Sequence, residues 1–209
     1  MNLLLQQFQL NFTLFIQGLG GWLLPVMDFF TSLGSEYAFL LILPLIYWCI
    51  DSAIGVRTAV MLSLSVSSHS ILKLIFHTPR PYWLDSRVKA FSAETSFGFP
   101  SGHSTDAVSV WGTVARGFKK RWLTLILIFV MFMIGLSRIY LGVHFLQDVL
   151  GGWLLGGLLL LGFALLDKPV SHWLSGKSLT VQILVCALVS VLILLTGILA
   201  RNIAAGFDI

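Results

Sequence analysis

Residues 137–148, SRIYLGVHFLQD, place three ionisable side chains in one short stretch of a very apolar chain. His144 and Asp148 are four positions apart, so on a helix they share one face. A carboxylate that accepts from one imidazole nitrogen fixes the tautomer and leaves the other nitrogen free as a nucleophile or base. The alternative is structural, with Arg138 satisfying Asp148 and pinning two helices together. Because ionisable groups are costly at membrane depth, three so close together favour a chemical role.

A second cluster, KLIFHTPRP at 73–81, places Lys73 and Arg80 seven residues apart. Pro79 and Pro81 stop a helix and fix the local backbone, so we expect Arg80 on a stiff turn. The alternative is that Lys73 extends to the lipid head groups and Arg80 anchors the chain at the interface.

The third cluster, FPSGHS at 99–104, is typical of a helix start. Ser101 or Ser104 can cap the helix, and Gly102 lets the backbone come close to a ligand. The free N–H groups of a helix start and the positive end of its dipole attract anions. His103 would lie at that anion site, where it could donate a proton.

Together these clusters offer three fixed cations, a helix N-terminus and two histidines, one of which has a carboxylate partner. Such a set fits a group with two negative charges spread over several oxygens, and phosphate is the obvious candidate. One histidine could attack phosphorus while the other protonates the leaving oxygen. The sequence has no acidic cluster suited to Mg²⁺, so we expect a metal-independent site without a cofactor.

The composition predicts a membrane protein with one all-α domain. Of the 209 residues, 57% are hydrophobic and only 11% are charged, which is far too little charge for a soluble surface. The formal net charge is +4, but the 13 Lys and Arg are scattered between apolar runs and form no stripe. We therefore expect no nucleic-acid partner.

Apolar runs predict a multi-pass helical bundle of about six spans. A helix needs about 20 residues to cross the hydrocarbon core. The first and third predicted spans are shorter than that and must borrow neighbouring residues or pack against other helices. The six predicted spans are 36–51, 55–76, 103–117, 122–141, 145–166 and 180–200.

Residues 1–34 show a different pattern. Gln6, Gln9, Thr13 and Gln17 form a polar stripe at helical spacing, and apolar residues occupy the opposite face. We predict two amphipathic helices lying at the membrane interface, separated by the GLGG sequence at 18–21. The alternative is a seventh span over residues 8–30.

The distribution of cations predicts the orientation. With six spans, alternate loops share a side, and the positive-inside rule places the side with more cations in the cytoplasm. The long loop 77–102, the turn 138–145 and both termini then face outward, together with Lys73, Arg80 and Arg138. The cytoplasmic side holds Arg57, Arg116, Lys119, Lys120, Arg121, Lys168 and Lys177, against Arg87, Lys89 and Arg201 outside.

The three clusters, in order and with these spacings, resemble the three-part signature of the type 2 phosphatidic acid phosphatase (PAP2) superfamily. The resemblance covers residues 73–148 as a motif core, within a membrane domain that we place at 35–209 after the interfacial segment 1–34. It implies that His144 is the nucleophile and forms a phosphohistidine, that Asp148 orients it, and that His103 is the general acid. The implied phosphate-binding residues are Lys73, Arg80, Ser101, Gly102 and Arg138.

The resemblance further implies a membrane phosphatase that hydrolyses lipid phosphate monoesters or diphosphates, with membrane lipids and the lipid substrate as its only evident partners. Candidate substrates are phosphatidate, phosphatidylglycerol phosphate, a sphingoid phosphate and undecaprenyl diphosphate. We expect a bacterial inner membrane location with the site on the extracytoplasmic face. The alternatives are a lipid phosphotransferase, a vanadate haloperoxidase, which the membrane helices disfavour, and a transporter. Transport is disfavoured because the charges gather at one end of the helices, not at the midplane.

Overall fold

The structure is a computed structural model that describes residues 3–204, and every regular element in that range is helical. Residues 1–2 of the predicted interfacial segment and 205–209 of the predicted membrane domain lie outside the described residues. The elements are α1 (Leu3–Gly18), η1 (Gly21–Leu23), α2 (Leu24–Ser32), α3 (Glu36–Cys49), α4 (Ser52–Phe76), α5 (Pro81–Leu84), α6 (Gly102–Asp106), η2 (Ala107–Trp111), α7 (Gly112–Phe118), α8 (Arg121–Tyr140), α9 (Leu146–Ser175) and α10 (Leu179–Ala204).

The chain is a multi-pass membrane protein. Four helical stretches of the described chain are long and apolar enough to cross a membrane: Ser52–Leu84, Arg121–Tyr140, Leu146–Ser175 and Leu179–Asn202. Two predicted spans are short, as the sequence indicated. One is α3, with 14 residues, and the other is the run 102–118, in which η2 forms a wider π-type turn between α6 and α7.

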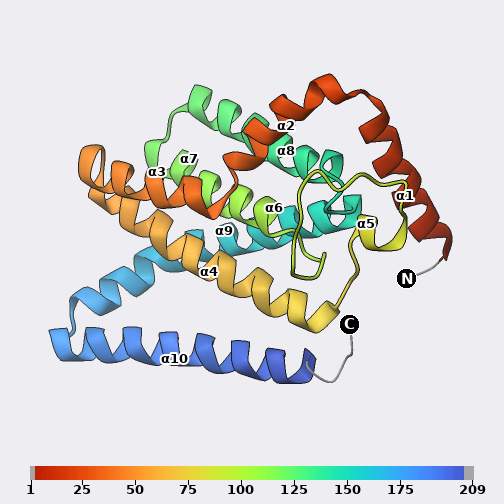
Figure 1. The fold of residues 1–209 in the computed structure, drawn as a ribbon. Coiled ribbons are helices and arrows are strands. Elements are labelled where there is room, and N and C mark those ends of the chain that lie inside the picture. The colour runs from red at the N-terminus through yellow and green to blue at the C-terminus, as the bar shows by residue number, and fades with distance from the viewer. Residues whose placement is uncertain (1–2, 205–209) are drawn as a thin grey trace.

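The bundle places α4, α6 to α9 side by side, with α3 against α4 and α2 against α8. The helix α10 packs along α4 on the outside of the bundle (Figure 1). The long loop after α5 lies at one end of the bundle, together with α1 and the turn between α8 and α9 (Figure 1). The motif clusters are therefore all at that end.

Local sequence explains where the helices begin and end. The Asp51 side chain accepts from the Ile54 N–H at 3.0 Å and caps α4. At its other end, α4 stops at Phe76 because His77 adopts the left-handed conformation (φ 48°) and Pro79 follows. The helix α9 runs to Ser175, past the predicted end at 166. Its extension carries Asp167, which pairs with Arg57 of α4 at 2.8 Å.

The N-terminal segment consists of two helices bent by 81°, joined at Gly20, whose φ of 117° favours glycine. Its polar stripe faces the protein. Gln9 and Thr13 are buried, and the Gln9 amide donates to Gln147 of α9 at 2.9 Å. Gln17 donates to the Lys89 carbonyl at 2.7 Å. The polar face thus attaches this segment to the site end of the bundle, while its interfacial placement stays a prediction.

Candidate active site

The three motif clusters meet from four helices at one end of the bundle. Lys73 lies in the last turn of α4, and Arg80 is the residue just before α5. His103 lies in the first turn of α6. Arg138 lies in the last turn of α8, and Asp148 lies in the first turn of α9. The sequence prediction that residues far apart in the chain share one site is consistent with this arrangement.

His144 and Asp148 are fully buried and face each other. The His144 Nδ1 lies 3.4 Å from Asp148 Oδ2, and the same oxygen accepts from the Phe145 N–H at 2.9 Å. On the other side of the ring, Arg80 Nη1 lies 3.3 Å from His144 Nε2. Since a guanidinium can only donate, Nε2 must accept, and the single proton of a neutral ring is then on Nδ1. This tautomer leaves the Nε2 lone pair directed toward the phosphate-binding cations.

Arg80 is held rigidly although it carries a buried charge. Its Nε donates to the Ser96 carbonyl at 2.7 Å and its Nη1 to the Val143 carbonyl at 2.8 Å. The Phe97 carbonyl accepts from Nη2 at 3.2 Å. Lys73 is also buried and donates to the Ser96 hydroxyl at 3.0 Å. The loop segment 96–97 therefore fixes both cations from one side, as buried charges require.

Arg138 has partners from two segments outside the motifs. Its Nη1 donates to the Thr31 hydroxyl at 2.8 Å, so the end of α2 helps to position it. Its Nη2 forms an ion pair with Glu94 of the long loop. A carboxylate on Arg138 occupies a position that a phosphate oxygen could take, since both are anionic acceptors.

The start of α6 packs tightly between neighbours. Ser101 is buried, its hydroxyl accepts from the Ser104 N–H at 3.4 Å, and its own N–H donates to the Asp148 carbonyl at 2.9 Å. A Cβ at Gly102 would lie 2.9 Å from His69 Cε1, so a side chain there would collide with the ring. The first N–H groups of a helix have no partner within the helix and favour an anion.

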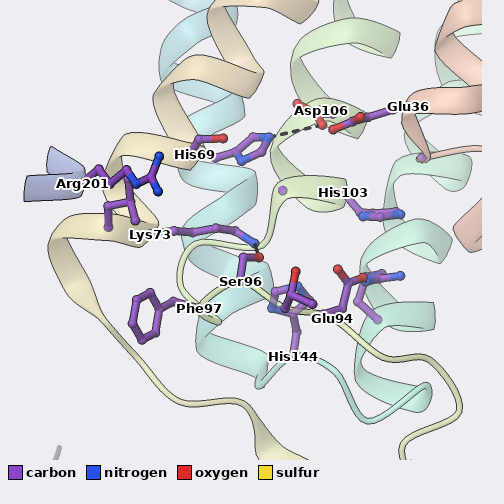
Figure 2. A pocket seen from close by; sticks show the side chains of 16 residues that line it. Glu36, His69, Lys73, Glu94, Ser96, Phe97, His103, Asp106, His144 and Arg201 are labelled. Carbon is purple, nitrogen blue, oxygen red and sulfur yellow. Dashed lines mark hydrogen bonds and ion pairs between the residues drawn. The ribbon is translucent and has the colours of Figure 1, made fainter. Parts of the chain in front are cut away.

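A cavity of about 770 Å³ opens among these groups (Figure 2). Of the eight predicted site residues, five line the cavity, and the other three, Arg80, Ser101 and Asp148, are buried behind its wall. Figure 2 shows His103 and His144 on facing parts of the cavity. The five that line it are Lys73, Gly102, His103, Arg138 and His144.

Burial lowers the pKa of the His144 imidazole well below its ordinary 6.5, and the charges of Arg80, Arg138 and Lys73 lower it further. The ring is therefore neutral at pH 7. A neutral imidazole keeps the lone pair that a nucleophile needs.

Several lining residues were not expected from the sequence. Asp106 accepts from Ser65 at 2.5 Å and lies 3.5 Å from His69, which forms a second histidine–carboxylate pair. Figure 2 shows this pair at the end of the cavity away from His144. Glu94 lies in a loop without periodicity, so no pattern marked it. Arg201 of α10 also lines the cavity. The distribution of cations predicted that Arg201 lies on the same side of the membrane as the site, but not that it lies in the site itself.

Comparison with known proteins adds independent findings. Residues 54–171 match the model of the family described as the PAP2 superfamily. The chain is 43% identical over 75 residues to phosphatidylglycerophosphatase B of Bacillus subtilis, covering 32% of this chain and 37% of that protein. It is 26% identical over 137 residues to an undecaprenyl-diphosphatase of Sulfolobus acidocaldarius, covering 63% of this chain and 64% of that protein. The chain thus spans less than two thirds of either relative.

The fold is also similar to a solved structure. The crystal structure of a transmembrane PAP2 type phosphatidylglycerolphosphate phosphatase from Bacillus subtilis aligns with a TM-score of 0.65 and 26% identity. The alignment covers 77% of this chain and 86% of that one. The likeness therefore extends well beyond the three motif clusters.

Proposed function

This chain belongs to the PAP2 superfamily, and from that premise we propose that it is a membrane phosphatase that hydrolyses lipid phosphate monoesters or diphosphates through a phosphohistidine. The observation that carries the proposal is the buried contact series Asp148–His144–Arg80, with 3.4 Å and 3.3 Å separating the ring nitrogens from their partners. The series orients a neutral imidazole toward a cationic cavity. The relatives named above act on lipid phosphates and diphosphates, which supports the substrate class.

In the first step, the Nε2 lone pair of His144 attacks phosphorus. The new P–N bond forms as the bond from phosphorus to the lipid oxygen breaks, and protonated His103 gives its proton to that leaving oxygen. Asp148 stabilises the Nδ1–H through the change in ring charge. Arg80, Lys73 and Arg138 balance the charge on the three phosphoryl oxygens.

In the second step, a water molecule attacks the phosphohistidine. Neutral His103 takes a proton from this water, the P–N bond breaks, and inorganic phosphate leaves. His144 returns to its neutral state and His103 to its protonated state. The sum is one lipid phosphate and one water converted to one lipid alcohol, or lipid monophosphate, and one phosphate.

We place the site on the extracytoplasmic face of a bacterial inner membrane. The support is the distribution of the Lys and Arg residues that are not in the predicted phosphate site. Most of them lie in the loops at the opposite end of the bundle, which the positive-inside rule places in the cytoplasm. At the bilayer surface a lipid can present its phosphate to the cavity while its tail stays in the hydrocarbon.

The test is phosphate release by the detergent-purified protein from a panel of lipid phosphates in EDTA, beside His144→Ala. We expect release that survives EDTA, because the positive charge at the site comes from side chains, and none from the variant. Near-normal release by His144→Ala would refute the nucleophile. No release by the native protein, with transfer to an added lipid alcohol, would favour phosphotransfer over hydrolysis.

A further inference from the structure

The last helix contributes to the site although it lies outside the family match, which ends at residue 171. Arg201, near the end of α10, lines the main cavity. Figure 2 shows its side chain on the same side of the cavity as Lys73 and His69, away from His103. The site of this chain therefore has a wall that the shared family region does not supply.

A second hollow, of about 300 Å³, lies between α4 and α10. From α4 it is lined by Ser67, Ser70 and Ile71, and from α10 mainly by aliphatic side chains and Gly197. Ser70 and Arg201 line both this groove and the main cavity, so the two hollows adjoin. The groove follows α10 from residue 201 back to 193, which is about 12 Å of helix.

The side chains that line the groove indicate which kind of molecule fits it. Leu194 and Ile198 line the groove, and both are about half or more exposed on a helix apolar enough to cross a membrane. An apolar channel that adjoins a cationic cavity matches a molecule with a phosphate at one end and a hydrocarbon chain at the other. We infer that the α4–α10 groove holds the apolar chain of the lipid substrate, and that Arg201 at the junction binds a second phosphoryl group between the hydrolysed phosphate and the chain. This inference rests on the proposed function.

The number of cations at the site supports the role of Arg201 in binding a second phosphoryl group. Lys73, Arg80 and Arg138 already supply three cations for one transferred phosphoryl group. Arg201 is a fourth, placed where the chain leaves the cavity, and its planar guanidinium is suited to a phosphate group. A single phosphate monoester has no further anion to offer there. A lipid diphosphate, or a lipid whose phosphodiester precedes a terminal phosphate, has one.

Three substrates separate the two parts of the inference: a long-chain prenyl diphosphate, the matching prenyl monophosphate, and isopentenyl diphosphate, which keeps the head group without the long chain. For Arg201→Gln we expect kcat/KM to fall about tenfold on both diphosphates, because a charged hydrogen bond is lost. The kcat/KM of this variant on the monophosphate should stay close to that of the native protein. Equal losses on all three substrates, or no loss on the diphosphates, would overturn the role of Arg201.

The groove is tested with Gly197→Phe, which fills it. A Cβ at Gly197 meets no atom within 4 Å, so the change should not disturb packing. We expect a lower kcat/KM on both long-chain substrates and an unchanged value on isopentenyl diphosphate. The matched control is Gly162→Phe on α9, which is equally open and lines neither hollow. A loss on isopentenyl diphosphate, or no effect on the long chains, would refute the groove.

The same assay distinguishes the source of the second phosphoryl group. Phosphatidylglycerol phosphate and phosphatidate form a second pair, which differs by a phosphodiester instead of a diphosphate. If Arg201→Gln lowers kcat/KM on phosphatidylglycerol phosphate but not on phosphatidate, and by more than on the prenyl diphosphate, the phosphodiester is the natural ligand of Arg201. If the native protein releases phosphate from none of these substrates, the proposed function itself fails. If it does so and both variants behave like native protein, only this inference fails.

Discussion

At the scale of single residues, the site is defined by what lies on each side of the His144 ring. Asp148 accepts from one nitrogen, and Arg80 donates to the other. Arg80 thus has two consequences: it acts with Asp148 to favour one tautomer, and it places a positive charge next to the atom that would attack phosphorus. A substrate phosphate would replace the ring as an acceptor for Arg80, which frees the Nε2 lone pair.

Asp148→Asn should keep substrate binding but lower kcat by roughly 10³- to 10⁴-fold, because the amide no longer selects the reactive tautomer. The measurement is steady-state hydrolysis with KM and kcat determined separately. A change confined to KM would contradict the orienting role.

The pH dependence follows from the lowered pKa of His144. Because folding lowers this pKa, the ring stays neutral as the pH falls through 6.5, and the nucleophile is lost only at lower pH. Histidine-labelled ¹⁵N NMR should give a titration midpoint for His144 below 6.5. Arg80→Gln should raise that midpoint, since it removes a neighbouring cation. A midpoint at or above 6.5 in the native protein would contradict the account.

At the scale of helices, close packing between α9 and α6 sets the position of the phosphate-binding turn. A Cβ at Gly152 would lie 2.6 Å from the Ser101 carbonyl oxygen and 2.8 Å from Ser104 Cβ. Glycine is therefore required for α9 to approach the start of α6 so closely. The aspartate and this glycine lie one turn apart on α9, so the same helix positions both halves of the site.

Gly152→Ala should destabilise the protein by about 1–3 kcal/mol and lower kcat, because Ser101 and the first turn of α6 must move. Gly157→Ala on the same helix is the control, since a Cβ there meets no atom within 4 Å. Thermal unfolding in detergent, with activity measured in parallel, checks both. Equal stability of the two variants would show that α6 adapts to the added methyl group.

The sequence predicted the parts of the fold that depend on local pattern. Apolar runs gave most of the helices, and the spacing of Lys73, Arg80, His144 and Asp148 indicated residues that do lie together. It could not predict the ion pair between Glu94 and Arg138 or the hydrogen bonds from Arg80 to Ser96, because loop contacts have no periodicity. The burial of the Gln9 face was also missed, since an amphipathic pattern does not state whether water or protein covers the polar side.

At the scale of the whole molecule, the bundle has the site at one end and loops rich in lysine and arginine at the other. The site, the long loop and Arg201 lie at the first. The turn with Lys119, Lys120 and Arg121 lies at the other end of α8. This polarity is the basis for the proposed orientation.

The orientation predicts different labelling of two exposed positions by a membrane-impermeant maleimide. In a background with Cys49 and Cys186 replaced by serine, Lys89→Cys should react in intact cells, and Lys120→Cys only after permeabilisation. Both native lysines are exposed, so access depends on the side of the membrane. The reverse pattern would place the site in the cytoplasm.

The central claim is that His144 carries the phosphoryl group during turnover. The most direct measurement is rapid quenching of the reaction with a lipid phosphate, followed by peptide mapping of the acid-labile phosphoryl group. We predict the group on the peptide containing His144 and its absence in His144→Gln. A phosphoryl group on any other residue, or phosphate release by His144→Gln at the native rate, would contradict the mechanism.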